Sequence, residues 1–148
     1  MPEDDRAAPS MAFAAVHSSS ADRPLRLLVA DDDEINRAII EHIILERADV
    51  LLTMVEDGRS ALELAQTQRF DLLIFDLNMP HINGDRLIRH LRASQSLNST
   101  SPMILFTAAV DGSGSLSGHR VSALADMILP KPIRAGMFLD AIGQLTGR

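Results

Sequence analysis

From Pro24 onward, the sequence alternates between short apolar runs and segments in which apolar residues recur every three or four positions. The apolar runs predict five strands, at residues 25–30, 50–55, 72–75, 103–106 and 127–129. The periodic segments predict helices around residues 35–44, 61–65, 87–91, 115–124 and 137–145. Near-continuous apolar strands separated by helices are typical of a parallel sheet covered on both faces. Since five such units cannot close an eight-stranded barrel, we predict an α/β fold with an open, doubly wound sheet.

Two of the predicted helices differ in the strength of their pattern. The first is strongly amphipathic, with an apolar face made of Ile35, Ala38, Ile39, Ile43 and Ile44. The fourth, at residues 115–124, is the weakest, because three glycines flank or interrupt it. We expect the region around the fourth helix to be the most mobile part of the domain.

Residues 1–23 have a different composition and are predicted to be a flexible N-terminal tail or linker. They contain two prolines, an acidic run at residues 3–5 and a serine-rich stretch at residues 18–20. The apolar patch at residues 11–16 is too short for a signal peptide, and the residues before it are acidic where a signal requires positive charge. We therefore expect one folded domain over residues 24–148, located in the cytoplasm.

Composition excludes several classes of protein. The chain has no cysteine, which rules out disulfides, thiolate metal sites and a thiol nucleophile. Its net charge of −6 argues against binding to nucleic acid. No apolar run approaches the roughly 20 residues that a membrane-spanning helix needs.

Polar residues of complementary chemistry follow four of the predicted strands. Asp31 and Asp32 follow the first strand, Asp76 the third, Thr107 the fourth and Lys131 the fifth. The carboxyl ends of parallel strands meet at one edge of a sheet, so we expect these side chains to share one pocket. Several carboxylates in one pocket need more positive charge than one lysine supplies, and Mg²⁺ is their natural complement. Such a site suits phosphoryl transfer, with a carboxylate as the nucleophile that forms an aspartyl-phosphate.

Each of these residues also has an ordinary structural explanation. The aspartates at 31–33 can cap the following helix, and Asp76 can be a turn residue. Their coincidence at four strand ends favours a functional site. Lys131 adds a separate argument, because it is the only lysine among 14 cationic residues. Its retention in an arginine-rich chain indicates that a compact point charge is needed at that position.

Four segments of this sequence together resemble the receiver domain of bacterial two-component response regulators. They are residues 28–37 (LVADDDEINR), 76–84 (DLNMPHING), 106–108 (FTA) and the Lys131-Pro132 pair. The resemblance covers residues 25–146. It implies a flavodoxin-like fold, with strand order 2-1-3-4-5 and five flanking helices.

The resemblance also implies a role for each matching residue. Asp76 would be the phosphoacceptor, with Thr107 and the backbone of Ala108 contacting the phosphoryl group and Lys131 pairing with it. Mg²⁺ would be bound by Asp31, Asp32, Asp76 and the backbone carbonyl of Asn78. The Lys131–Pro132 bond would be cis, and Gly84 would let the loop after Asp76 turn into the third helix. The phosphoryl donor would be a sensor histidine kinase or a histidine phosphotransfer protein, and a downstream protein would bind the face around residues 112–146.

The sequence departs from the family at Ile128, three residues before Lys131, where family members often carry an aromatic residue that changes rotamer on activation. We therefore do not expect an aromatic switch of that kind.

Two other functions remain as alternatives to the phosphoacceptor. One is a receiver-like binding module that never takes phosphate; the other is a phosphatase of the haloacid-dehalogenase class with its aspartates at 31 and 33. The phosphatase leaves residues 76–80 without a role, and Ile35 stands where its motif wants threonine or valine. Whether the chain is a free-standing regulator or the receiver part of a hybrid kinase stays open at this point.

Overall fold

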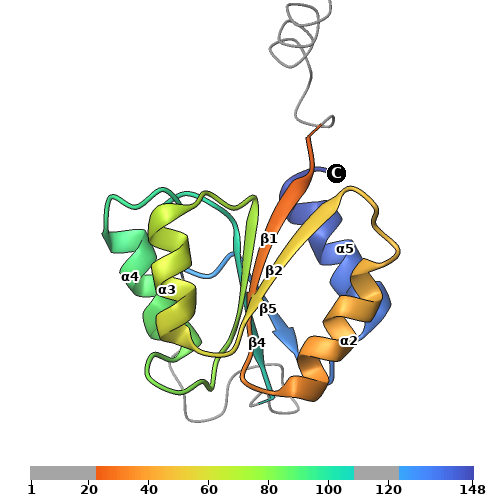
Figure 1. Cartoon of the computed structure of the whole chain (residues 1–148), viewed down its shortest axis with the longest axis horizontal. Coiled ribbons are helices and arrows are strands. Elements are labelled where there is room, and N and C mark those ends of the chain that lie inside the picture. Colours follow the sequence, from red (N-terminus) through yellow and green to blue (C-terminus); the bar gives the residue numbers. More distant parts are fainter. Residues whose placement is uncertain (1–22, 109–123) are drawn as a thin grey trace, which may run out of the picture.

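A computed structural model describes residues 23–108 and 124–148, and it contains the predicted parallel sheet (Figure 1). Its five strands are β1 (Leu25–Ala30), β2 (Val50–Val55), β3 (Leu72–Asp76), β4 (Met103–Thr107) and β5 (Met127–Pro130). Every neighbouring pair is parallel, and the strand order is β2-β1-β3-β4-β5, as expected. The described helices are α2 (Glu34–Ile44), α3 (Gly58–Thr67), α4 (Gly84–Ala93) and α5 (Ala135–Thr146). The predicted helix at residues 115–124 lies, apart from Leu124, outside the described residues.

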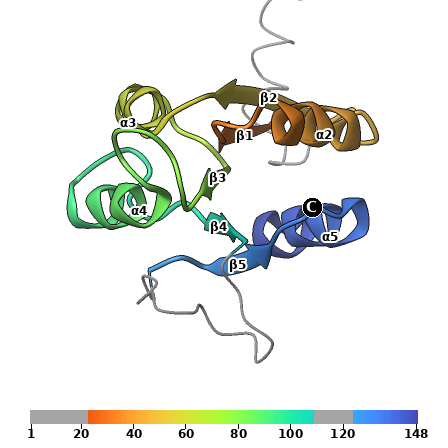
Figure 2. The ribbon, with the colours of Figure 1, turned by 90° about the horizontal axis from the view of Figure 1, so that it is seen from below.

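The helices cover both faces of the sheet in two pairs (Figures 1 and 2). Helices α2 and α5 pack on one face, and α3 and α4 pack on the other. Alternate residues of each strand contribute to the two apolar clusters: Leu27 and Val29 of β1 belong to the first, and Leu28 and Ala30 to the second. This doubly wound arrangement buries both faces of the central strands, which explains their continuous apolar sequences.

The apolar face predicted for the first helix is wrong for three of its five residues. Ile43 and Ile44 of α2 are buried, but Ile35 is 70% exposed and Ile39 is 38% exposed, and Ala38 is exposed as well. The third buried residue is Ile40. Because isoleucines are frequent in this helix, two overlapping periodic sets exist, and only the packing against the sheet selects one of them.

The start of β3 is fixed by Asn98, a buried amide in the loop between α4 and β4. Its Nδ2 donates to the carbonyls of Ala65 and Gln68 at 2.6 and 2.8 Å, and its Oδ1 accepts the backbone N–H of Phe70 at 2.8 Å. The end of α3 is thereby tied to the segment that leads into β3. Within the described residues, none of the helices combines the length and apolar character that crossing a bilayer requires.

Candidate functional site

Three carboxylates gather at the carboxyl ends of β1 and β3. Asp31 directly follows β1 and is 1% exposed, Asp76 is the last residue of β3 and is 4% exposed, and Asp32 is exposed at the rim. One oxygen from each of the three lies within 4.8 Å of the others. The strand register explains this proximity, because β1 and β3 are adjacent parallel strands that end at the same edge of the sheet.

Lys131 brings a positive charge to the same point from the end of β5. Its Nζ lies 3.0 Å from Oδ2 of Asp76 and 3.5 Å from Oδ2 of Asp31. The backbone N–H of Lys131 donates to the carbonyl of Thr107, which anchors the lysine beside the end of β4. The Lys131–Pro132 peptide bond is cis, as the resemblance implied. The structure therefore brings Asp31, Asp32, Asp76 and Lys131 together as predicted.

The electrostatics of the site are dominated by burial and by the pairing of Asp76 with Lys131. Burial raises the pKa of Asp76 from 3.8 to about 6, and the charge of Asp31 adds to this rise, while Lys131 opposes it. Burial acts to lower the pKa of Lys131, but its hydrogen bond to Asp76 and the charges of both aspartates outweigh that effect, so this pKa is raised. Lys131 therefore stays protonated next to a carboxyl group whose ionisation is disfavoured by burial.

Asp31 is held in a fixed orientation. Its Oδ1 accepts the backbone N–H of Asp33 at 2.9 Å, whereas its buried Oδ2 accepts no hydrogen bond. The side chain of Arg37 donates to the backbone carbonyl of Asp31 at 2.7 Å and lies 3.9 Å from Glu56. Arg37 belongs to the segment that carries the resemblance, but no role was predicted for it, because it lies within α2 and not at a strand end.

The other predicted site residues lie around this centre. The backbone N–H of Asn78 donates to Oδ1 of Asp76 at 3.3 Å, and its side chain is exposed. Thr107 is completely buried at the end of β4, and Ala108, directly after it, is exposed. Ile128, the residue in place of the expected aromatic, is 40% exposed on β5.

The loop between β3 and α4 is held by two close backbone approaches. A Cβ built on Gly84 lies 2.4 Å from the carbonyl oxygen of Asp76, and one built on Gly58 lies 2.1 Å from the carbonyl oxygen of Ile82. The φ angle of Gly84 is not positive, so the backbone conformation does not require glycine there. Glycine is needed instead because any Cβ would collide with the backbone of Asp76. Gly58 was not predicted as a site residue, because only the fold places the start of α3 against this loop.

The carboxylate cluster fits a hard divalent cation. Mg²⁺ binds oxygen ligands and usually keeps several waters, so two or three carboxylates with one exposed side suit it. The unbonded Oδ2 of Asp31 and the exposed position of Asp32 agree with that requirement. An open pocket beside Asp32, lined by Asn78, Met79, Pro80 and Asn83, gives access from solvent.

Residues 27–143 match the family model described as the response regulator receiver domain. Among curated proteins, the chain is 30% identical over 125 residues to the sensory/regulatory protein RpfC of Xanthomonas campestris and 34% identical over 125 residues to the response regulator MprA of Mycolicibacterium vanbaalenii. Each match covers 84% of this chain, but 17% of RpfC and 52% of MprA. The chain thus spans about half or less of the length of these relatives.

A solved structure gives the same fold. The receiver domain of the sensor histidine kinase PA1611 from Pseudomonas aeruginosa superposes with a TM-score of 0.70 at 24% identity, and the match covers 84% of this chain and 99% of that domain. Its description records a magnesium ion coordinated in the active-site cleft of that protein.

Proposed function

This chain belongs to the response regulator receiver domain family, and from that premise we propose that it accepts a phosphoryl group on Asp76 from a phosphohistidine and thereby switches its binding to a downstream protein. Receiver domains are signalling switches of two-component systems, and they occur both in response regulators and in hybrid kinases. The observation that carries the proposal is the contact between Asp76 and Lys131 inside a cluster of three carboxylates.

In the proposed transfer, an oxygen of Asp76 attacks the phosphorus of the phosphohistidine. The new O–P bond forms as the P–N bond breaks, and the imidazole nitrogen takes the electron pair of the broken bond and a proton from water. Lys131, 3.0 Å from Asp76, is placed to offset the negative charge of the phosphoryl oxygens in the transition state and in the product. Hydrolysis by water returns the carboxylate, so the domain works as a self-resetting switch without a turnover substrate.

Asp31, Asp32, Asp76 and the backbone carbonyl of Asn78 are the groups we assign to Mg²⁺. When bound, the cation neutralises charge on the transferring phosphoryl group and orients it. The protein's part is to keep Asp31 buried and fixed by the N–H of Asp33 and by Arg37, while Oδ2 accepts no hydrogen bond and lies 3.5 Å from the ammonium of Lys131. Asp32 at the exposed rim completes the carboxylate set.

The donor we propose is a sensor histidine kinase or a histidine phosphotransfer protein in the cytoplasm. Helix α2 begins immediately after the aspartates, and Ile35 in its first turn is 70% exposed. Exposed apolar residues next to a phosphoacceptor favour a protein donor, since burying them on contact stabilises the complex.

We assign the output to the face around residues 112–146. In its described part, a groove of about 450 Å³ lies between β5 and α5, and its apolar lining includes Met127, Leu129 and Met137. We propose that Thr107 and the backbone of Ala108 contact the phosphoryl group and transmit its presence to this face. Since Ile128 stands where family members often carry an aromatic residue, a rotamer change of that aromatic side chain is not available here. The conformational change on that face must involve another residue.

The proposal is tested by intact mass spectrometry after incubation with a small acyl-phosphate and Mg²⁺. We expect one phosphoryl group on the wild type and none on Asp76→Asn. A phosphorylated histidine phosphotransfer protein should give the same product faster than the small donor. An unmodified wild-type protein in both reactions would instead favour a receiver-like binding module, and equal modification of the Asn variant would refute Asp76 as the acceptor.

A further inference from the structure

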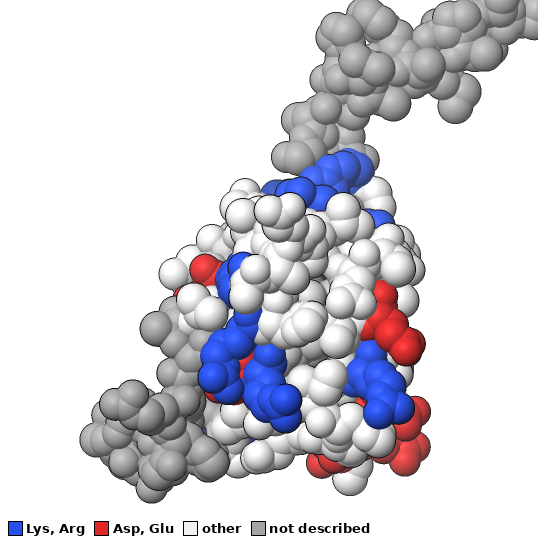
Figure 3. Space-filling model, turned by 90° about the vertical axis from the view of Figure 1, so that its left-hand side faces the viewer, with Lys and Arg blue, Asp and Glu red and all other residues white. Residues whose placement is uncertain are grey.

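A second pocket lies at the amino ends of the strands, at the opposite end of the sheet from Asp76. Its volume is about 190 Å³. Its basic lining comes from three separate segments: Arg23 before β1, Arg69 in the loop before β3 and Arg148 after α5. Figure 3 shows basic side chains at this end of the molecule, at the top of the view, and both basic and acidic side chains in the lower half. The receiver function assigns no role to this pocket.

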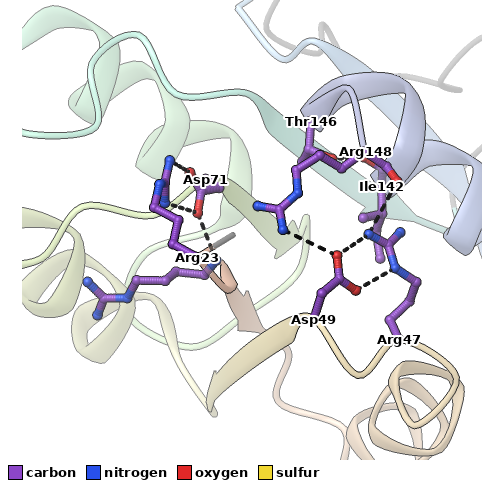
Figure 4. Close-up of polar contacts among 8 residues, drawn as sticks. Arg23, Arg47, Asp49, Asp71, Ile142, Thr146 and Arg148 are labelled. Atoms are coloured by element: carbon purple, nitrogen blue, oxygen red, sulfur yellow. Dashed lines mark hydrogen bonds and ion pairs between the residues drawn. The ribbon is translucent and has the colours of Figure 1, made fainter. Parts of the chain in front are cut away.

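Two carboxylates organise the arginines around the pocket (Figure 4). Asp71 accepts two hydrogen bonds from Arg23, at 3.2 and 3.1 Å, and a third from the backbone N–H of Arg26 at 2.8 Å. Asp49 accepts two from Arg47, at 2.8 and 2.7 Å, and its Oδ2 lies 3.6 Å from the guanidinium of Arg148. Both oxygens of each aspartate are therefore already engaged by the neighbouring arginines.

The charges around the pocket do not balance. Among the side chains that line the pocket, those of Arg23, Arg69 and Arg148 carry three positive charges and that of Asp71 carries one negative charge, so the lining side chains leave an excess of two positive charges. Arg69 accounts for part of it, because its exposed guanidinium has no ion pair with any described residue. The positive charge of Arg69 helps to lower the pKa of Asp71.

We infer that this pocket binds a phosphate-sized dianion, either inorganic phosphate or the phosphate group of a small phosphomonoester. A guanidinium group can donate two parallel hydrogen bonds to two oxygens of a phosphate, and Arg23, Arg69 and Arg148 bring three such groups to the pocket lining from three separate segments. The hydroxyl-bearing residues Thr100, Ser101 and Thr146 also line the pocket.

Size and charge select this ligand class. Pockets for drug-sized molecules measure roughly 300–1,000 Å³, so a pocket of about 190 Å³ suits a single small anion or an anionic head group. A carboxylate would neutralise one of the two excess charges, whereas a phosphate group, with about −1.5 to −2 at neutral pH, neutralises nearly both. The site lies away from the Mg²⁺ cluster, so binding requires neither the metal nor an ionisable Asp76.

The test is a titration of the Asp76→Asn protein with inorganic phosphate in metal-free buffer at constant ionic strength, followed by backbone amide NMR shifts. We expect saturable shifts at residues 69–71, 100–101 and 146, with little change at residues 31–33 and 76–78. Arg69→Gln should weaken binding at least fivefold, because Arg69 has no other described ion pair, while its exposed position leaves the fold intact. Arg59→Gln removes an exposed arginine outside the pocket and should leave the affinity unchanged.

A parallel titration with glycerol phosphate separates the two sources of the anion. Tighter binding of the ester identifies a phosphomonoester as the ligand, and equal or tighter binding of inorganic phosphate identifies the free anion. The inference is overturned if the shifts do not saturate, if they are confined to the Asp31–Asp76 site, or if the Arg59 and Arg69 variants weaken binding equally, because that would indicate only general charge attraction.

Discussion

The Nζ of Lys131 lies 3.0 Å from Oδ2 of Asp76, although β3, which ends at Asp76, and β5, which Lys131 directly follows, are not neighbours. Strand β4 runs between them, and the backbone N–H of Lys131 bonds to Thr107 at the end of that strand. Lys131 therefore reaches across one strand to meet the carboxylate. A side chain with a long flexible stem and a compact charge suits this task.

Replacing Lys131 with arginine conserves the charge but should still impair phosphorylation. The lysine side chain is 17% exposed and lies against two aspartates, so a larger planar group must shift away from Asp76. We expect the rate of phosphorylation by a small acyl-phosphate to fall about tenfold, the cost of one weakened charge-assisted hydrogen bond. The rate of mass increase measures it, with the exposed Arg59→Lys as the matched control; an unchanged rate in Lys131→Arg would show that the ammonium itself is not required.

The stability of the metal-free protein should depend on pH through Asp76. The native carboxyl has a pKa of about 6, against 3.8 as its ordinary value, so between these pH values the native state holds a proton that the unfolded chain has released. The free energy of unfolding therefore falls as pH rises from about 4 to 6, by on the order of 1–2 kcal/mol after allowance for solvent screening. Urea unfolding in chelator at a series of pH values measures this change. Asp76→Asn removes the titrating carboxyl. The difference in the free energy of unfolding between wild type and variant should therefore grow as pH rises from about 4 to 6 and stay constant at higher pH.

Magnesium should stabilise the folded protein, because the carboxylate cluster exists only in the native state. At a tenfold excess over the Kd, the expected gain is about 1.4 kcal/mol, visible as a rise in the melting temperature. Asp32→Asn removes one of the three clustered carboxylates and should reduce this gain. Asp140→Asn, an exposed aspartate on α5, is the control and should respond to Mg²⁺ as the wild type does. Equal responses of the two variants would argue against Asp32 as a ligand.

Gly84→Ala should be destabilising, whereas Gly136→Ala should not. A Cβ at Gly84 lies 2.4 Å from the carbonyl oxygen of Asp76, so the backbone must move, at a cost of roughly 1–3 kcal/mol. Gly136 in α5 has no atom within 4 Å of its added Cβ, and alanine there should be neutral or stabilising by up to about 1 kcal/mol. Chemical denaturation of both variants measures the difference. A stable Gly84→Ala protein would mean that the loop after Asp76 adapts freely.

Much of the fold could be predicted because its signals are local. The strands at residues 25–30 and 50–55 have the predicted bounds, since each is a short, mostly apolar run that is followed directly by acidic residues. The residues at the strand ends were predicted for the same reason, and the structure brings Asp31, Asp76 and Lys131 into contact. Which isoleucines of α2 face the core was predicted wrongly, because helical periodicity alone allows more than one buried face.

The sequence by itself determined the order of strands and helices and the chemistry placed after each strand, because both depend on residues close together in the chain. Tertiary structure alone decided the relationships between distant segments. These are the distance of 3.0 Å between Lys131 and Asp76, for which the sequence predicted only a shared pocket, the approach of Gly84 to the backbone of Asp76, and the meeting of Arg23, Arg69 and Arg148 at one pocket. Such contacts depend on strand order and on packing distances of a few ångströms, and no local pattern in a single sequence encodes them.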